Sequence, residues 1–465
     1  MAHAGATMAA GAAGRAGAGG PESAAPPARS HDRYADALRA GALLVVVLGH
    51  WLATLPRVDG GLQGADHLLD VWRTAGLLTW VLQVVPLFMF VSAAVTAHSA
   101  DRVNREGVTL SAWWGARALR LARPTATYLW ALALLVGAAA IWAGTARFID
   151  VFDQSLTVHL WFLVMLLALQ ACLPAAVAAD RRWGWRVVLG LVVAAGGVEV
   201  VRALTAGPVT PATLSRLGDQ VTAVAGGPGW LNMMLVWLVP QQLGVIWGRK
   251  GLRSPGGAGL VALGLLWLLV AVRAGYPTAM VGGDLAGSSN VLPPTLALLG
   301  VIWLQVGMVV ALEPLARRVA ARGSGRVVAL LTALGMPLYL WHKLAEVPAA
   351  AIAVRLGLPV DAGDPGDPAF WAARLLWIGL ATLMVGPVLL AVVAFERRRR
   401  ATVPVTARPW RVAVGGALLL AGLVAALYLG ASAALGAAVA VTAASLLLRA
   451  GRGAGAGQDA RTRRS

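Results

Sequence analysis

The chain is poor in cysteine, lysine and charge. Of its 465 residues one is a cysteine, Cys172, which rules out a disulfide within the chain. Cys172 lies in an aliphatic run without an activating neighbour in sequence, so a catalytic thiol is not expected. The two lysines, Lys250 and Lys343, are far outnumbered by arginines, which favours a GC-rich bacterial source. Charged residues make up 13% of the chain and hydrophobic residues 58%, a balance that excludes a soluble globular protein.

The sequence also gives no sign of a metal site or of a nucleic acid partner. No His-x-x-x-His motif and no carboxylate pair at ligand spacing occurs, so no metal site is expected. The net charge of +18 would suggest a nucleic acid partner in a soluble chain, but here the cations lie between apolar runs. They fit membrane topology and anionic lipid instead, and no nucleic acid partner is expected.

Long apolar runs dominate what remains. Each is long enough to cross about 30 Å of hydrocarbon as a helix. The predicted fold is therefore all-α, a polytopic transmembrane helix bundle with a ten-span core and two C-terminal spans. Only Gly430 separates the last two spans, which could instead form a re-entrant hairpin. The predicted spans are Ala37–Leu55, Leu77–Ala97, Pro124–Ala143, Val158–Ala178, Arg186–Leu204, Trp230–Gly248, Gly257–Arg273, Leu292–Glu313, Val327–Val347, Phe370–Phe395, Arg411–Leu429 and Ala431–Leu448.

Composition also predicts the domain organisation. Residues 1–32 and 450–465 are rich in small residues and are predicted to be disordered cytoplasmic tails, the first without the apolar core of a signal peptide. Between them we expect a membrane core over residues 33–396, a basic cytoplasmic linker over residues 397–410 and two further transmembrane helices over residues 411–449.

Arginine placement predicts the orientation in the membrane. Arginine-rich connections, such as the one that carries Arg102 and Arg105, alternate with poorer ones that hold Asp59, Asp66 and Asp70. By the positive-inside rule both termini face the cytoplasm. We therefore expect a multi-pass protein of the bacterial cell membrane, with membrane lipids as its surroundings and an oligomeric state that the sequence leaves open.

The first candidate site joins Arg39 to His50 in the first span. Eleven positions return to the same helix face within about 20°, roughly 16 Å further along the axis. Ionisable groups at that depth are costly, which makes them functional candidates. The alternatives are a cation that reaches the headgroups at Arg39 and a helix–helix hydrogen bond at His50. Asp36, three residues before Arg39, could simply neutralise it.

The second candidate site is basic. Arg117 and Arg120 share a helix face, and Arg123 with Pro124 follows at the predicted start of the third span. Paired guanidiniums suit the phosphates of a ligand, since each presents a planar fork to phosphate oxygens. The alternative is a topology anchor on the cytoplasmic side.

Two weaker candidates lie in later spans. Tyr339, His342 and Glu346 share one face of the ninth span, where they could form part of a site or an interfacial anchor. Glu199 and Arg202 in the fifth span are most simply a buried ion pair.

Several of these segments resemble the acyltransferase-3 family of integral membrane acyltransferases. The stretch from Arg33 to His50 is similar to the family's opening, which reads Arg-x-x-x-Leu-Asp-x-Leu-Arg, then ten residues, then His. The resemblance spans about Arg33 to Phe395. Three further segments resemble family motifs in the family's order: Val85–Ser92, Arg117–Pro124 and Leu334–His342. The sequence departs from the family pattern at Ala93, where the family has glycine, and at Met336 and Pro337, where it has a Ser-Tyr pair.

The resemblance implies transfer of an acyl group, expected to be acetyl, from acyl-CoA to a hydroxyl of a carbohydrate, lipid-linked or secondary-metabolite acceptor. It implies His50 and Arg39 as catalytic residues and Arg117, Arg120 and Arg123 as the acyl-CoA site. Acyl-CoA would be a donor substrate, with no permanently bound cofactor. A histidine near neutral pKa suits a general base. An acyl-histidine intermediate is the competing mechanism.

The oxyanion that develops on the thioester needs hydrogen-bond donors. Tyr339 or His342 could serve if the ninth span packs against the first, and Asp36 and Glu199 are further candidates for substrate contacts. Two other functions stay open: a transporter or flippase of polar lipids or metabolites, and an inactive membrane scaffold. The identity of the acceptor is not encoded in any pattern we recognise.

Overall fold

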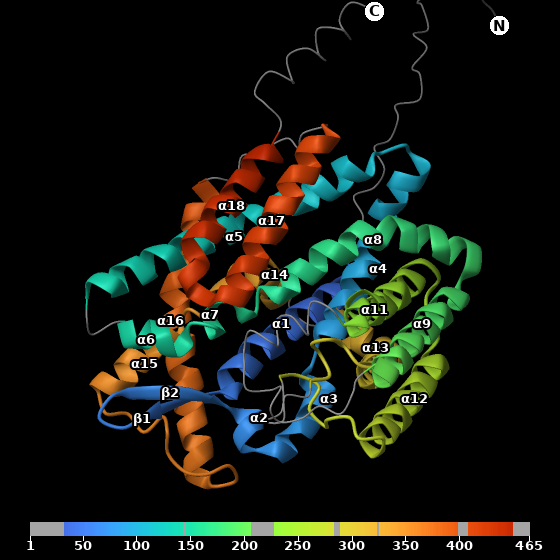
Figure 1. Ribbon diagram of the computed structural model, residues 1–465. Helices are drawn as coiled ribbons and strands as arrows, with labels where there is room; N and C mark the ends of the chain where they lie inside the picture. The colour runs from blue at the N-terminus through green and yellow to red at the C-terminus, as the bar shows by residue number, and fades with distance from the viewer. Residues whose placement is uncertain are drawn as a thin grey trace, which may run out of the picture. The chain divides into compact units, whose positions relative to one another are not determined.

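The computed structural model describes residues 32–142, 146–205, 227–282, 289–322, 325–398 and 408–449 (Figure 1). The predicted tails, most of the basic linker and the connection after residue 205 fall largely outside these ranges. The long helices are α1 (Arg33–Ala53), α4 (Val85–Arg105), α5 (Leu110–Ile141), α8 (Trp161–Trp183), α9 (Trp185–Thr205), α11 (Leu231–Lys250), α12 (Ser254–Arg273), α13 (Ala297–Arg322), α14 (Gly325–Trp341), α16 (Pro368–Arg398), α17 (Pro409–Leu429) and α18 (Ala434–Leu447).

Short elements connect these helices. Strands β1 (Thr54–Val58) and β2 (Leu62–His67) form one antiparallel hairpin directly after α1. It lies beside α6 and α15 (Figure 1). The short helices are α2 (Leu68–Val71), η1 (Arg73–Leu78), α3 (Thr79–Leu82), α6 (Ala146–Phe152), α7 (Ser155–Val158), η3 (Pro228–Trp230), α15 (Glu346–Arg355) and η4 (Gly430–Ala433).

The predicted all-α membrane bundle is confirmed, and each predicted span overlaps a long helix. Within the described residues, nine helical stretches are long and apolar enough to cross a membrane, or ten if the bent pair α14 and α15 is one span. Two features account for the difference from the predicted number. Helix α11 carries the amides Asn232, Gln241 and Gln242, which lower its hydropathy, and α17 and α18 count together as one stretch.

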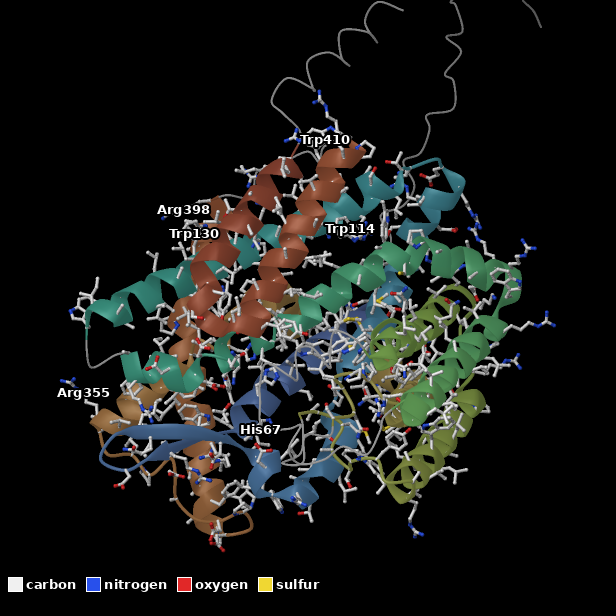
Figure 2. All side chains as sticks on the ribbon, viewed as in Figure 1. His67, Trp114, Trp130, Arg355, Arg398 and Trp410 are labelled. Atoms are coloured by element: carbon white, nitrogen blue, oxygen red, sulfur yellow. The ribbon has the colours of Figure 1, made fainter. Side chains whose placement is uncertain are left out.

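Helices α17 and α18 form an antiparallel hairpin beside α5 (Figure 1). Gly415 lies against Ala444 and Gly422 lies against Ala437, so the lack of a side chain at these two positions of α17 lets the helices approach closely. Gly430 turns the chain at a φ of +72°, and a Cβ there would collide with the Asp153 carboxylate. Figure 2 labels Trp114 and Trp130 of α5 next to this hairpin, and Trp130 Nε1 donates to Thr442 Oγ1 at 3.0 Å.

Helix α5, which corresponds to the third predicted span, starts at Leu110 and not at Pro124 as predicted. Thr109 caps α5 by accepting a hydrogen bond from the Ala112 N–H, and the helix then runs through Pro124 to Ile141. Arg117, Arg120 and Arg123 therefore lie inside a helix and not in the connection before it.

The ninth predicted span is broken. Helix α14 ends at Trp341 and α15 starts at Glu346 after a bend of 66°. His342 and Lys343 lie in the break and are almost fully buried, at 0% and 4% exposure. Irregular backbone inside a membrane is tolerated where protein or a cavity surrounds it, which fits this position. Helix α14 also packs against α1. The ninth span therefore lies beside the first, as a role of Tyr339 or His342 near His50 requires.

Candidate active site

A cavity of about 920 Å³ lies inside the bundle, along α1. Most of its lining is aliphatic or aromatic. The polar residues of the lining include Arg39, the seventh residue of α1, His50 near the end of that helix, and His67 at the end of β2 (labelled in Figure 2). Asp66 and Lys343 are further charged residues of the lining. The predicted residues Arg39, His50 and Tyr339 thus border one space.

The two histidines of the site are bonded to each other. His50 Nδ1 lies 2.7 Å from His342 Nε2, and the two ring planes are within 12° of each other with centroids 5.0 Å apart. Helix α1 fixes His50 because Leu43, Val47 and Trp51 on the same helix are buried. Trp51 also donates from Nε1 to the His342 carbonyl at 3.0 Å, which ties α1 to the break after α14.

The backbone determines which ring nitrogens carry protons. His342 Nδ1 lies 2.8 Å from the Tyr339 carbonyl oxygen, which can only accept, so Nδ1 must carry the proton. In a neutral ring Nε2 of His342 is then an acceptor, and His50 Nδ1 must donate to it. His50 Nε2 is left with a lone pair. His50 lines the cavity and His342 does not, so His342 fixes the ring of a histidine whose Nε2 is able to accept a proton.

A buried ion pair supports the break next to this histidine pair. Lys343 Nζ bonds both oxygens of Glu346 at 2.6 and 2.8 Å and Thr54 Oγ1 at 3.1 Å. Thr54 Oγ1 also lies 3.0 Å from the His50 carbonyl oxygen. Since an ammonium has three N–H donors, all donors of Lys343 are engaged. The ion pair therefore holds the end of α1 against the start of α15.

Arg374 of α16 also binds the end of α1, through the backbone of Thr54. Its guanidinium donates to the Thr54 carbonyl at 2.8 Å and to the Val360 carbonyl. The side chain is 2% exposed. Helices α1, α15 and α16 are thus joined through one threonine.

A third histidine, His159, borders the cavity between α7 and α8. It is 2% exposed, and its ring centroid lies 5.3 Å from that of His342. The Tyr339 hydroxyl donates to its backbone carbonyl. The predicted residue Tyr339 is therefore bonded to the backbone of its neighbour rather than directed at a ligand.

Arg39 forms the expected ion pair with Asp36, at 3.6 Å, and its side chain is 33% exposed. Both residues lie in the first two turns of α1, and Arg39 lines the cavity while Asp36 does not. The pairing is loose enough for Arg39 to contact a ligand as well.

The predicted basic site lies outside the cavity lining. Arg117 donates to Ser99 Oγ at 2.7 Å and to the Trp113 carbonyl at 3.1 Å, and it stacks over the Trp113 ring. Its contacts join α5 to α4. Arg120 is exposed, Arg123 is partly exposed, and neither borders the cavity.

Glu199 is also separate from the cavity. It pairs with Arg202 at 3.4 Å, as expected of a buried ion pair, and accepts from Tyr276 at 3.2 Å and from Asn232 at 3.4 Å. These bonds connect α9, the start of α11 and the loop after α12.

The end of the cavity beyond His50 is formed in part by the β-hairpin. Burial lowers the pKa of His67, and the nearby Asp70 carboxylate partly opposes this shift. His67 Nδ1 accepts the Leu69 N–H at 3.3 Å, as a neutral ring does at the start of α2. This end of the cavity thus carries an uncharged imidazole at neutral pH.

Three residues of the site are missing from the sequence prediction. Lys343 reads as an interfacial anchor in sequence, although a lysine three residues before a glutamate in an apolar span is a signal for a buried pair. His159 reads as an interfacial aromatic neighbour of Trp161. Arg374 gives no local signal, since its role depends on α16 packing beside the end of α1.

Fold and site together define a multi-pass membrane protein with a hydrogen-bonded histidine pair, of which one member, His50, lines a cavity. The family model described as an acyltransferase domain, that of the acyltransferase-3 family, matches residues 32–397. The match covers most of the chain, so the chain belongs to this family and is a membrane acyltransferase. Comparisons with curated proteins and with solved structures gave no match.

Proposed function

We propose that this protein transfers an acyl group from acyl-CoA to a hydroxyl of an acceptor, with His50 as the general base. The observation that carries the proposal is the hydrogen-bonded pair of His50 and His342, which leaves a lone pair on His50 Nε2 at the wall of the cavity.

In this mechanism His50 Nε2 takes the hydroxyl proton as the acceptor oxygen attacks the thioester carbon. His342 accepts the Nδ1–H of the resulting imidazolium and so stabilises its charge. Collapse of the tetrahedral intermediate breaks the C–S bond, and the imidazolium returns the proton to the departing thiolate. The products are the acyl ester and free CoA.

The donor enters at the Arg39 end of α1 in this proposal. By the arginine distribution that end faces the cytoplasm, where acyl-CoA is made. Arg39 is the cavity-lining cation closest to this entrance, and the exposed Arg120 with Arg123 and Arg117 would add positive potential for the CoA phosphates. The pantetheine arm would then extend along the cavity toward His50.

The acceptor reaches His50 from the opposite end, where β2 and His67 border the cavity. Most of the cavity lining taken as a whole is apolar, which favours an acceptor with an apolar part, lipid-linked or a secondary metabolite, over a free sugar. We place the protein in the bacterial cell membrane with both termini in the cytoplasm.

The lone pair of His50 could instead attack the thioester and form an acyl-histidine. A rapid denaturing quench at neutral pH during turnover with radiolabelled acetyl-CoA, followed at once by removal of small molecules, separates the two mechanisms. The general-base mechanism predicts that no label stays on the protein, whereas an acyl-histidine would carry it.

The test of the function uses membrane vesicles that contain the protein, radiolabelled acetyl-CoA and an extract of envelope lipids, glycans and metabolites from the producing cells. Wild-type protein should incorporate label into one acceptor class. His50→Gln should lower the rate at least about a hundredfold, the usual contribution of a general base. His98→Gln is the matched control, because His98 is an exposed histidine of α4 outside the cavity.

Absence of transfer by wild-type protein with acetyl-, butyryl- and octanoyl-CoA would contradict the proposed activity. Unchanged turnover of His50→Gln would leave the activity but refute the role of His50. The family match favours this function over a transporter, which would move a labelled acceptor without acylating it.

A further inference from the structure

Gln83 is a buried glutamine of the cavity wall whose side-chain amide has no hydrogen-bond partner among the described residues. It lies at the junction of α3 and α4, is 5% exposed and borders the cavity. Unlike the buried ring nitrogens of His159, its amide oxygen and nitrogen are not closed off from the cavity. Buried polar groups are normally hydrogen-bonded, so an amide left open toward a cavity is suited to bind what enters there.

The backbone around Gln83 is fixed by a second glutamine, Gln305 of α13. This residue is 2% exposed, and its Nε2 lies 2.9 Å from the Gln83 carbonyl oxygen. It also lies 3.3 and 3.2 Å from the carbonyl oxygens of Trp80 and Val81. These are carbonyls that the end of a helix leaves without a partner in the helix itself. Gln305 therefore holds the end of α3 in place, and the Gln83 amide extends from a fixed backbone.

The contacts of α3 place Gln83 at the His67 end of the cavity. Thr79, one helical turn before Gln83, accepts the Met280 N–H at 2.8 Å. Two residues further along, Gly282 lies against His67, since a Cβ on this glycine would be 4.0 Å from His67 Cε1. Helix α3 also packs against α1. The Gln83 amide thus belongs to the end at which the acceptor is proposed to enter.

The charged side chains of the described lining are Arg39, Asp66 and Lys343, and none is left to bind a charged acceptor at this end. Arg39 lies at the opposite end of the cavity. Asp66 accepts from Arg57 at 2.8 Å, and Lys343 is bonded to Glu346 and Thr54 as described above. A phosphate or carboxylate would lose its hydration there without gaining an unpaired cation. The site therefore suits an uncharged acceptor.

A hydroxyl complements the Gln83 amide in both directions. It can accept a hydrogen bond from Nε2 and donate one to Oε1, whereas a carbonyl can only accept. The hydroxyl that is acylated cannot be this partner, because it donates its proton to His50 and attacks the thioester carbon with a lone pair. The partner must be another hydroxyl of the same molecule.

We propose that Gln83 binds a second hydroxyl of the acceptor and so determines which hydroxyl reaches His50. The acceptor is accordingly an uncharged molecule with at least two hydroxyl groups. This inference rests on the proposed acyl transfer and names the class of its acceptor. No covalent bond forms or breaks at Gln83, and its role is to bind and orient.

The test measures the two KM values separately. Wild-type protein in vesicles first labels its acceptor from radiolabelled acetyl-CoA and the envelope and metabolite extract, and the purified product is deacetylated to give the acceptor probe. Gln83→Met keeps the length of the side chain and removes the amide. We expect it to raise the KM for the probe about tenfold, with kcat within about threefold and the KM for acetyl-CoA within about twofold.

Gln241→Met is the matched control, because Gln241 is a glutamine of α11 that is 3% exposed and lies outside the cavity lining. It should leave both KM values unchanged. Derivatives of the probe that are methylated at a single hydroxyl add a specificity readout. One derivative that keeps the acetylated hydroxyl should lose at least about tenfold in kcat/KM with wild-type protein, and Gln83→Met should use it about as well as the parent probe.

A probe KM of Gln83→Met within about twofold of wild type, or an equal rise of both KM values, would overturn the inference while the acyl transfer itself stands. So would a labelled acceptor that is charged or has a single hydroxyl. If Gln83→Met does not fold, as judged by gel filtration in detergent, Gln83→Leu takes its place with the same limits. Absence of transfer by wild-type protein contradicts the proposed function and, with it, this inference.

Discussion

The histidine pair of α1 and the α14–α15 break differs from the arginine motif of α5 in how its polar atoms are used. His50 is held by one bond on the far side of its ring, and its second nitrogen is left for the cavity. Arg117 is bonded to Ser99 and to the Trp113 carbonyl and stacks on a ring, all outside the cavity lining. One region leaves a ring nitrogen beside the cavity, and the other joins two helices and adds charge.

Two residues on the same face of a helix therefore need not share a function. The function of each depends on the element that packs against it. For His50 the neighbour is the buried break after α14, and for Arg117 it is α4. The predictions below ask whether the first region controls the chemical step and the second controls stability and donor affinity.

The largest effect is expected at the buried ion pair beneath the histidines. Glu346→Gln leaves the buried Lys343 charge unpaired, which typically costs about 3–5 kcal/mol. The apparent Tm in detergent should fall accordingly. Glu106→Gln breaks the exposed pair with Arg102 and should cost at most about 1 kcal/mol.

Replacing both Lys343 and Glu346 by apolar residues tests whether the unpaired charge causes this loss of stability. Lys343→Met combined with Glu346→Leu should restore most of the lost stability, because no charge is then buried. Equal Tm shifts for Glu346→Gln and Glu106→Gln would contradict the importance of the buried pair.

The next largest effect is expected on the KM for the acyl donor, acetyl-CoA. Arg39 is the arginine that lines the cavity among those of the predicted site, so Arg39→Ala should raise the KM for acetyl-CoA about tenfold, or about 1.4 kcal/mol. Arg120→Ala should raise it only a few-fold, since this exposed cation acts through screened potential. The few-fold effect should vanish as salt is raised. A larger KM change for Arg120→Ala than for Arg39→Ala would reverse the assignment of the two cations.

The smallest effect is expected at Arg117. Loss of its bond to Ser99 should cost about 1–2 kcal/mol of stability, because a hydrogen bond to a charged group is removed at a partly buried site. Ser99→Ala is the matched variant and should produce much of the same Tm shift without changing any arginine. An unchanged Tm for Arg117→Ala, accompanied by a large increase in donor KM, would show that this arginine belongs with the ligand site after all.

Hydropathy and residue spacing predict much of the fold but not its irregular points. The apolar runs place the spans well, because a helix is the structure that satisfies its own backbone in lipid. They do not reveal that the ninth span breaks after Trp341, since Leu344, Ala345 and Val347 continue the apolar pattern beyond it. The early start of α5 was hidden by Pro124, which reads as a helix start but lies inside the helix.

For the site, sequence spacing predicts the positions of Arg39 and His50 on one face, and the order of motifs identifies His342. It cannot show that the two histidines bond, because this contact joins residues 292 positions apart. Arg374 and His159 enter the site through packing of α16 and of the α7–α8 junction, which no local pattern encodes.

The most direct test of the account is a double-mutant comparison of kcat for acyl transfer with His50→Ala, His342→Ala and the double variant. If His342 acts by holding the His50 ring, each single loss disables the same base, and the double variant should be no slower than His50→Ala alone. Independent losses that multiply in the double variant would contradict the claim that the two histidines work as one unit.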